Sequence, residues 1–548
     1  MNKQRQSGRS GRFLGAAVLA AAGLAAPAAF GVPSSEAAAN AQHFLADAVR
    51  PDSPPWRYAQ VPGYEVISEC GDDETNDVLR SLVAGREVSE FLLPPGFFNE
   101  DTYPSSVILY NARPGEAAGG PVRAVPSRNA RTAWRTQFDE EAQPIPESRV
   151  NEMDGTSACI ELPPADGPVP CIGGKGYPDI PRLLGAIPRF QAAHRVPEFP
   201  QWLVAGLVGP GGPLASGWRV RQVVPTHLDL PTALWVDSAE TAYVRQHGRP
   251  SIGLIPARQF FEDAGPHAAA WNSQAALFVR WGLFSRAYAL GSHTRAFWNF
   301  VARATGRPVD EAMFRASFGF GYRELDAQLS GMLPDAVSNF VATQVDINLR
   351  PAIPALRIAT PGEVGRIVGD WERAQGEGLA ERFPEVSSKL LDAAGATLET
   401  AQAGAGQDAE VSGALGIYEA QAGRTDAALA DLEAAVRGQF RRPLVYLALA
   451  QLRYRAFEAR ARGHGGKFDA AQEAAVFEPL QAARKLLPST AATYRMAARA
   501  ILRGSDKPTG DELSLMAEGR QLYWRDPVFG GLADRVEAMA EGGRSAGG

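Results

Sequence analysis

From residue 177 to the C-terminus, apolar side chains recur at helical spacing in almost every segment, whereas the residues before it include short alternating stretches. Alternation predicts strands at 63–68, 106–110 and 158–162. Between the first two strands, helical spacing predicts a helix over 74–93 with Asp72 or Asp73 at its N-cap. The polar residues 113–150 predict a loop-rich insertion. Further helices are predicted at 180–193, 199–207, 256–263, 268–288, 293–305, 310–317 and 322–333, which together form an all-helical block.

A second helical region follows the prolines of residues 349–361, which mark a boundary. Beyond them the composition shifts to Ala, Leu, Glu and Arg. Residues 411–452 resemble a tetratricopeptide repeat, in which small residues stand where paired helices touch. The alternative is a generic Ala-rich bundle. The matching residues are Gly416, Gly423, Ala428, Leu432 and Ala435, with Pro443 opening the next helix, and further helices are predicted at 444–461, 468–487 and 491–502.

The N-terminus has the order of a secretory signal peptide. Lys3, Arg5, Arg9 and Arg12 precede an apolar, Ala-rich run from residue 13 to residue 29, and small residues follow. A membrane anchor is the alternative, but a spanning helix needs about 20 apolar residues, and this run is shorter. We expect export to the periplasm or the exterior, with no stable membrane insertion after cleavage.

Three cysteines are present: Cys70, Cys159 and Cys171. Export permits disulfides, and a Pro/Gly-rich loop between Cys159 and Cys171 would let these two meet, which leaves Cys70 unpaired. The alternative is three buried thiols that pack as small apolar groups. The spacing does not favour zinc, because no C-x-x-C motif occurs.

The composition is that of a globular protein, with 45% apolar and 21% charged residues. At 548 residues the chain is longer than one ordinary domain. Its formal net charge of −6 provides no basic surface. Because binding to phosphates depends on clustered Lys and Arg, nucleic acid is not an expected partner.

The segment from Phe199 to Leu207 (FPQWLVAGL) is similar to the P-x-W-L-x-E-G-L segment of bacterial gluzincin-like (peptidase MA-like) metallopeptidases. Residues 271–279, 311–319 and 322–326 also resemble family sequences, and the resemblance covers roughly residues 56–335. It implies a thermolysin-like, mainly helical middle part. In the family, a helix with H-E-x-x-H supplies two zinc ligands and a general base, and the glutamate of the second helix is the third ligand.

This chain departs from the family at each ligand position. Ala205 stands where the third ligand belongs, and no H-E-x-x-H occurs anywhere in the sequence. The usual family gap places the lost histidine helix near Arg182, Leu183 and Ala186. His194, Glu198 and His227 would be the first residues to test if the protein nevertheless bound zinc. Since zinc ligands must be several and mutually placed, we expect no metal and no other cofactor.

The sequence therefore predicts an α+β protein with six parts. These are a signal peptide (1–39), a linker (40–55), a small mixed α/β part with a loop-rich insertion (56–173), a gluzincin-like helical part (174–340), a linker with connecting helices (341–400) and all-α tetratricopeptide-like repeats (401–540). The predicted function is non-catalytic binding or scaffolding, with a protein or peptide partner held by the repeats. The alternative is a divergent hydrolase or metallopeptidase whose active-site residues are unrecognised.

Overall fold

The structure is a computed structural model, and it describes residues 55–94, 103–111, 157–162, 197, 199–209, 212–213, 219–221, 227–230, 232–262, 269–344, 346, 351–380, 384–461, 466–486, 490–504 and 507–542. Helices dominate these residues, and two small sheets lie among them. The predicted α+β class is confirmed at this level. The expected signal peptide, the insertion at 113–150 and the helix at 180–193 lie outside the described residues.

The larger sheet has the order β4-β3-β2-β1-β8. Strands β2, β3 and β4 are parallel, while β1 and β8 add to the sheet in antiparallel fashion. The three predicted strands are confirmed, but β1 and β8 were not predicted. The bounds are β1 (Arg57–Val61), β2 (Tyr64–Ser68), β3 (Ser105–Asn111), β4 (Ser157–Leu162) and β8 (Arg357–Ile358).

Among the described residues, a helix packs on each face of this sheet. Helix α2 (Asp72–Leu92) packs on the face that presents Val66 and Val107. Helix α12 (Pro361–Leu379) packs on the opposite face, where Ile67 and Ile108 meet Trp371. Successive strand residues point to opposite faces, so the alternation that predicts the strands also supplies both apolar layers.

Helix α2 begins one or two residues earlier than the predicted caps imply. Its N-cap is Gly71, whose backbone N–H donates to the Glu74 carboxylate over 2.8 Å. The prediction of Asp72 or Asp73 as the cap was therefore wrong. Both acids lie in the first helical turn, where negative charge interacts favourably with the helix dipole.

The helices from residue 201 to residue 338 surround α8, whose residues from Ser273 to Gly282 are all buried. The helices that the sequence predicts within the described residues of this region are confirmed. Helix α11 continues beyond its predicted end, through Pro334 to Ser338. Their bounds are α5 (Gln201–Val208), α6 (Ser238–His247), α7 (Ala257–Glu262), α8 (Ala269–Phe284), η4 (Ser285–Tyr288), α9 (Thr294–Ala304), α10 (Glu311–Phe318) and α11 (Tyr322–Ser338).

This block is not all helical, as the sequence had suggested. It contains the unpredicted helix α6 and a three-stranded antiparallel sheet in the order β5-β6-β7. The strands have only three or four residues, which is too short for alternation to distinguish them from loops. They are β5 (Arg219–Arg221), β6 (His227–Leu230) and β7 (Val341–Gln344).

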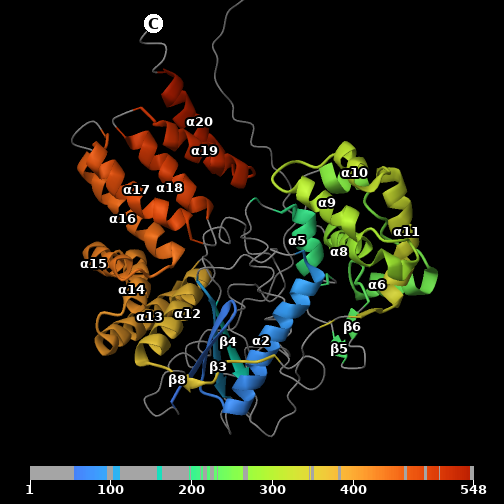
Figure 1. Cartoon of the computed structure of the whole chain (residues 1–548), viewed down its shortest axis with the longest axis horizontal. Coiled ribbons are helices and arrows are strands. Elements are labelled where there is room, and N and C mark those ends of the chain that lie inside the picture. The colour runs from blue at the N-terminus through green and yellow to red at the C-terminus, as the bar shows by residue number, and fades with distance from the viewer. Residues whose placement is uncertain are drawn as a thin grey trace, which may run out of the picture.

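Helices α12 to α20 form a stack of helix pairs. Consecutive helices form pairs. The first helix of each pair (α12, α14, α16 and α18) lies beside the first helix of the next pair, and α20 follows α18 (Figure 1). Small residues allow close approach: a Cβ on Gly365 would lie 2.3 Å from that of Ala401. The bounds are α13 (Pro384–Ala405), α14 (Ala409–Gln421), α15 (Thr425–Arg437), α16 (Pro443–Ala461), α17 (Ala470–Arg484), α18 (Ala491–Arg503), α19 (Gly510–Leu522) and α20 (Pro527–Gly542).

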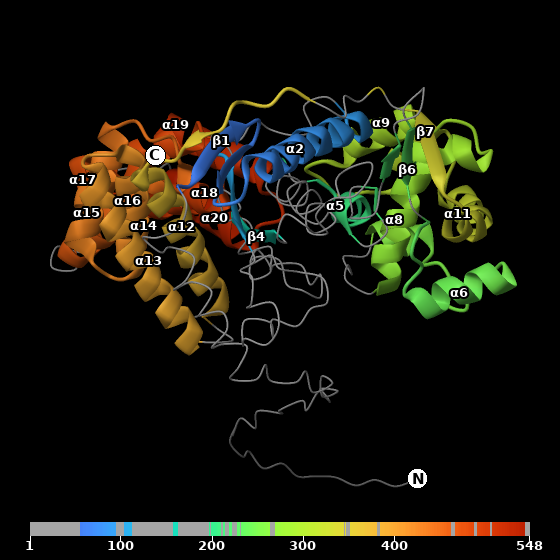
Figure 2. The same cartoon turned by 90° about the horizontal axis from the view of Figure 1, so that it is seen from below.

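The larger sheet lies between the helix stack and the α5–α11 block (Figure 1). Helix α2 runs from the sheet toward α5, as Figure 2 shows, and its end places Val88 and Leu92 in the core of that block. In the described part of the chain, no helix is both long enough and apolar enough to cross a membrane.

Candidate functional site

Ala205, which stands at the family's third zinc-ligand position, lies on α5. Pro200 is the N-cap of this short helix, and Ala205 is half-buried against the core of the α5–α11 block. Its methyl side chain has no atom that can coordinate a metal. The other three expected positions, Arg182, Leu183 and Ala186, lie outside the described residues.

The location of α5 is determined by packing. The Trp202 ring stacks on Phe300 with centroids 5.5 Å apart, and its edge contacts include Phe278 at 5.0 Å. On the same helix, Gly206 touches α8 so closely that a Cβ would lie 2.4 Å from the Ala275 carbonyl oxygen. The residue pattern that resembles the peptidase motif thus builds an apolar core at this point.

The cysteines divide between the described and undescribed parts. Cys159 lies in β4, where its backbone pairs with Ile108, while Cys171 lies outside the described residues. The Cys159–Cys171 disulfide therefore stays a prediction. Cys70 is a buried free cysteine, and its burial raises the pKa of the thiol.

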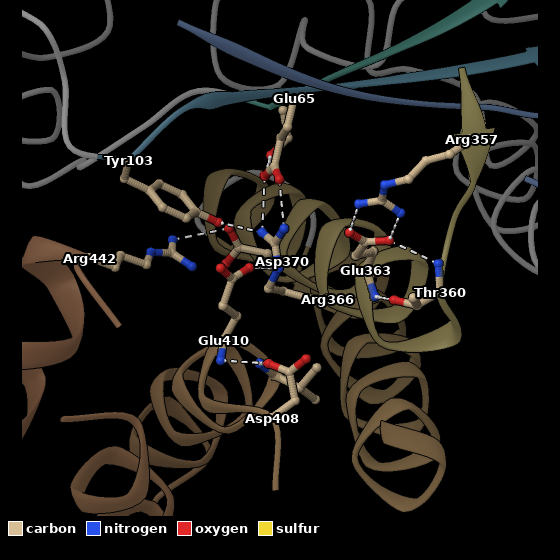
Figure 3. A network of polar contacts seen from close by, with 12 residues as sticks. Glu65, Tyr103, Arg357, Thr360, Glu363, Arg366, Asp370, Asp408, Glu410 and Arg442 are labelled. Atoms are coloured by element: carbon tan, nitrogen blue, oxygen red, sulfur yellow. Dashed lines mark hydrogen bonds and ion pairs between the residues drawn. The ribbon is translucent and has the colours of Figure 1, made fainter. Parts of the chain in front are cut away.

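A polar cluster of the described residues joins the sheet to the helix stack (Figure 3). Arg366 of α12 donates to both carboxylate oxygens of Glu65 in β2, over 3.0 and 2.6 Å. Ser106 of β3 donates to the same carboxylate over 2.6 Å. Arg366 and Glu65 are each only 2% exposed, so this bidentate ion pair is sealed from solvent.

Two further elements join the cluster through Arg366. The Tyr103 hydroxyl accepts a hydrogen bond from Arg366 Nη1 over 3.1 Å, and Glu410 at the start of α14 lies 3.1 Å from Arg366 Nε. Burial alone would lower the pKa of Arg366, but Glu65, Tyr103 and Glu410 together outweigh it and raise that pKa. The guanidinium therefore stays charged and contacts three separate segments of the chain.

Asp370 forms a second centre, one helical turn along α12. It pairs with Arg442 at the start of α16 over 3.0 Å and with Arg373 over 2.9 Å. Burial would raise the pKa of Asp370, but the two guanidinium groups hold it well below its usual range. The Arg442 guanidinium also lies over the Tyr103 ring, 4.4 Å from its centroid.

The cap of α12 completes the connection between sheet and stack. Thr360 is the N-cap, and its hydroxyl accepts from the Glu363 N–H over 3.2 Å. The Glu363 carboxylate binds Arg357 of β8 at the sheet edge. The cluster can thus hold α12 in register with the sheet. Its acids already bind guanidinium groups, so it offers no ready general base.

Two other acids are buried inside helix pairs. Glu372 of α12 is 2% exposed and Glu419 of α14 is 6% exposed. Burial raises the pKa of each to about 7, and Asp431 adds to the shift at Glu419. Each lies in a different pair of helices, and Glu419 is hydrogen-bonded to the Asp431 carboxyl of α15 within its own pair. Among the described residues, no three His, Cys, Asp or Glu side chains are placed to hold one metal ion.

The sequence did not predict this cluster. Glu65 and Arg366 are 301 residues apart, and neither belongs to a recognisable motif. The available signal was Glu65 itself, a charged residue inside an apolar strand, which requires a partner when buried.

Searches against protein-family models, curated proteins and solved structures find no match for this chain.

Proposed function

We propose that this chain is a non-catalytic binding or scaffolding protein, built from a degenerate gluzincin-like domain and a tetratricopeptide-like helix stack. The observation that carries the proposal is the side chain at position 205. The family chemistry needs a carboxylate there to complete a three-ligand zinc site. Ala205 provides none, and the helix that bears it is packed through Trp202 and Gly206.

The helix stack supports the second half of the proposal. Helix α16 begins 34 residues after α14 begins, which is the length of a tetratricopeptide repeat. Gly416 contacts Leu432 across the pair, and Ala428 and Ala435 are fully buried. These small residues lie between the paired helices α14 and α15, which supports the proposed repeat.

The buried charge cluster supports scaffolding. Glu65, Arg366 and Asp370 connect the sheet to the stack through ion pairs that are shielded from solvent. Such an interface holds the helix pairs at a defined angle to the sheet. A binding surface on the stack would then be presented in a fixed orientation relative to the α5–α11 block.

The catalytic half of the proposal is tested by metal content and peptidase activity. Protein purified without chelator is expected to hold much less than one zinc per chain and to show no phenanthroline-sensitive cleavage of casein. Ala205→Glu is the matched variant, because it restores one ligand and leaves the two histidines and the base absent. One tightly held zinc per wild-type chain would contradict the proposal.

The binding half is tested with a photo-crosslinking amino acid placed on the outer helices of the stack. Ala430 of α15 and Ala474 of α17 are exposed, and Ala312 of α10 is an exposed alanine elsewhere. Illumination of native cells should give a defined adduct from the first two positions and none from the third. Equal adduct patterns at all three positions would count against binding through the stack.

We also propose that the protein is exported, on the basis of the basic and apolar order of residues 1–39. Mass spectrometry should then find a mature N-terminus between about residues 30 and 42, since processing follows the small residues. Intact Met1 on protein from the cytoplasm would refute export.

A further inference from the structure

Two of the helices that open a pair in the stack, α14 and α16, contain long runs of buried residues. Every residue from Val411 to Glu419 of α14 is buried, and so is the run from Val445 to Ala450 of α16. Stacked helix pairs ordinarily leave a concave surface along their first helices. In this protein Tyr103, from outside the stack, packs into the apolar cluster formed by α14, α15 and α16.

The Tyr103 side chain enters the stack from outside it. It lies two residues before β3, yet its ring belongs to the apolar cluster of α14, α15 and α16 and not to the core of the sheet. The ring is 6% exposed and meets the edge of Phe440 at a centroid distance of 5.9 Å. Figure 3 shows its hydroxyl directed toward Arg366.

The surroundings of Tyr103 match each part of a phenol. The Arg442 guanidinium lies against the face of the ring, which carries partial negative charge. Phe440 makes the edge contact that aromatic pairs prefer. Arg366 donates to the hydroxyl oxygen. These contacts recognise the ring itself and depend little on the chain that carries it.

The same surroundings favour a neutral ligand. Arg366 is already neutralised by Glu65, and Arg442 is paired with Asp370. Burial raises the pKa of Tyr103, so its phenol stays protonated. A phosphorylated or carboxylated ring would carry a negative charge. Both arginines are already paired with carboxylates, so neither could neutralise that charge.

We propose that Arg366, Phe440 and Arg442 form a tyrosine-binding pocket, that Tyr103 fills it as an internal ligand, and that the partner carries a tyrosine on an extended segment which competes for it. This inference rests on the proposed binding function and names its ligand chemistry. The segment around Tyr103 shows the mode of binding, because it leads directly into an extended strand.

The experiment uses full-length Tyr103→Ala, which removes the ring and leaves the pocket residues in place. p-Cresol, the side chain of tyrosine as a free molecule, should raise the melting temperature of this variant by about 2 °C or more at tenfold its Kd. Wild-type protein should not respond, because Tyr103 occupies the pocket. Toluene, which lacks the hydroxyl, should bind roughly tenfold more weakly.

If Tyr103→Ala does not fold by itself, it is refolded in the presence of p-cresol. Recovery of folded protein that requires p-cresol supports the pocket. An equal response of variant and wild type, or none during melting and refolding, overturns it. An acetylated peptide of residues 100–107 should then bind the variant, and its tyrosine-to-alanine version should not. If p-cresol binds but the tyrosine peptide does not, the claim about the partner is overturned. Neither result decides the crosslinking and zinc tests, which judge the proposed function separately.

Discussion

Replacing Arg366 with methionine should separate the helix stack from the sheet. The substitution keeps the length and apolar stem of the side chain but removes the donors to Glu65, to the Tyr103 hydroxyl and to Glu410. Glu65 would keep only the hydrogen bond from Ser106 among those that the cluster provides. A carboxylate 2% exposed would then be left without its countercharge.

The expected cost follows from this isolation of Glu65. Removing one partner of a buried ion pair costs about 3–5 kcal/mol, because the remaining charge can neither hydrate nor pair. We expect the upper part of this range, since Arg366 also holds Tyr103 and Glu410. The matched control is Arg86→Met, which breaks the exposed Arg86–Glu90 pair of α2 and should cost about 0.5 kcal/mol or less.

Hydrogen exchange with mass spectrometry is the appropriate assay, because the chain has several separate cores. Peptides from β2 and α12 should lose protection in Arg366→Met, while peptides from α8 should not change. The double variant Glu65→Leu/Arg366→Met removes both charges and should recover most of the loss. A single-variant cost below about 1 kcal/mol, or a double variant no better than the single, would refute the reasoning.

Gly206→Ala should destabilise the protein by about 1–3 kcal/mol through overpacking of α5 on α8. Gly331→Ala on the open face of α11 should instead stabilise it by about 0.5–1 kcal/mol. Urea unfolding measures both free-energy changes. Because the folded pKa of Glu419 is raised from 4.5 to about 7, stability should fall as pH rises through that interval, and Glu419→Gln should flatten the slope. A non-reduced digest should link the peptides of Cys159 and Cys171, and two separate peptides would exclude that bridge.

The sequence predicted the elements whose signal is local. Residues 268–288 are apolar on nearly every face, which is typical of a buried helix, and α8 with η4 occupies 269–288. The small residues at 416, 428 and 435 likewise predicted the α14–α15 pair. In each case a single segment carries enough periodic residues to determine its own structure.

Two of the missed features depend on partners far along the chain. Strand β8 has two residues and pairs with β1 about three hundred residues earlier, so its sequence has no alternation to detect. Arg366 lies on a helix whose other residues explain its formation without Glu65. Only the packing of α12 on the sheet brings the two charges together, and no local pattern records that packing.

The prolines of residues 349–361 predict a domain boundary, yet cutting the chain there should damage both sides. Helix α12 covers Ile67 and Ile108 of the sheet with Trp371, and the cut would expose this apolar face. It would also leave Glu65 without Arg366 inside a strand. Solenoid ends need a polar cap to remain soluble, and here the sheet provides that cap for α12. A fragment of residues 361–542 should therefore aggregate. The double substitution Ile367→Gln/Trp371→Gln should restore the solubility of this fragment. If the unmodified fragment is instead soluble and folds cooperatively, the stack is independent of the sheet.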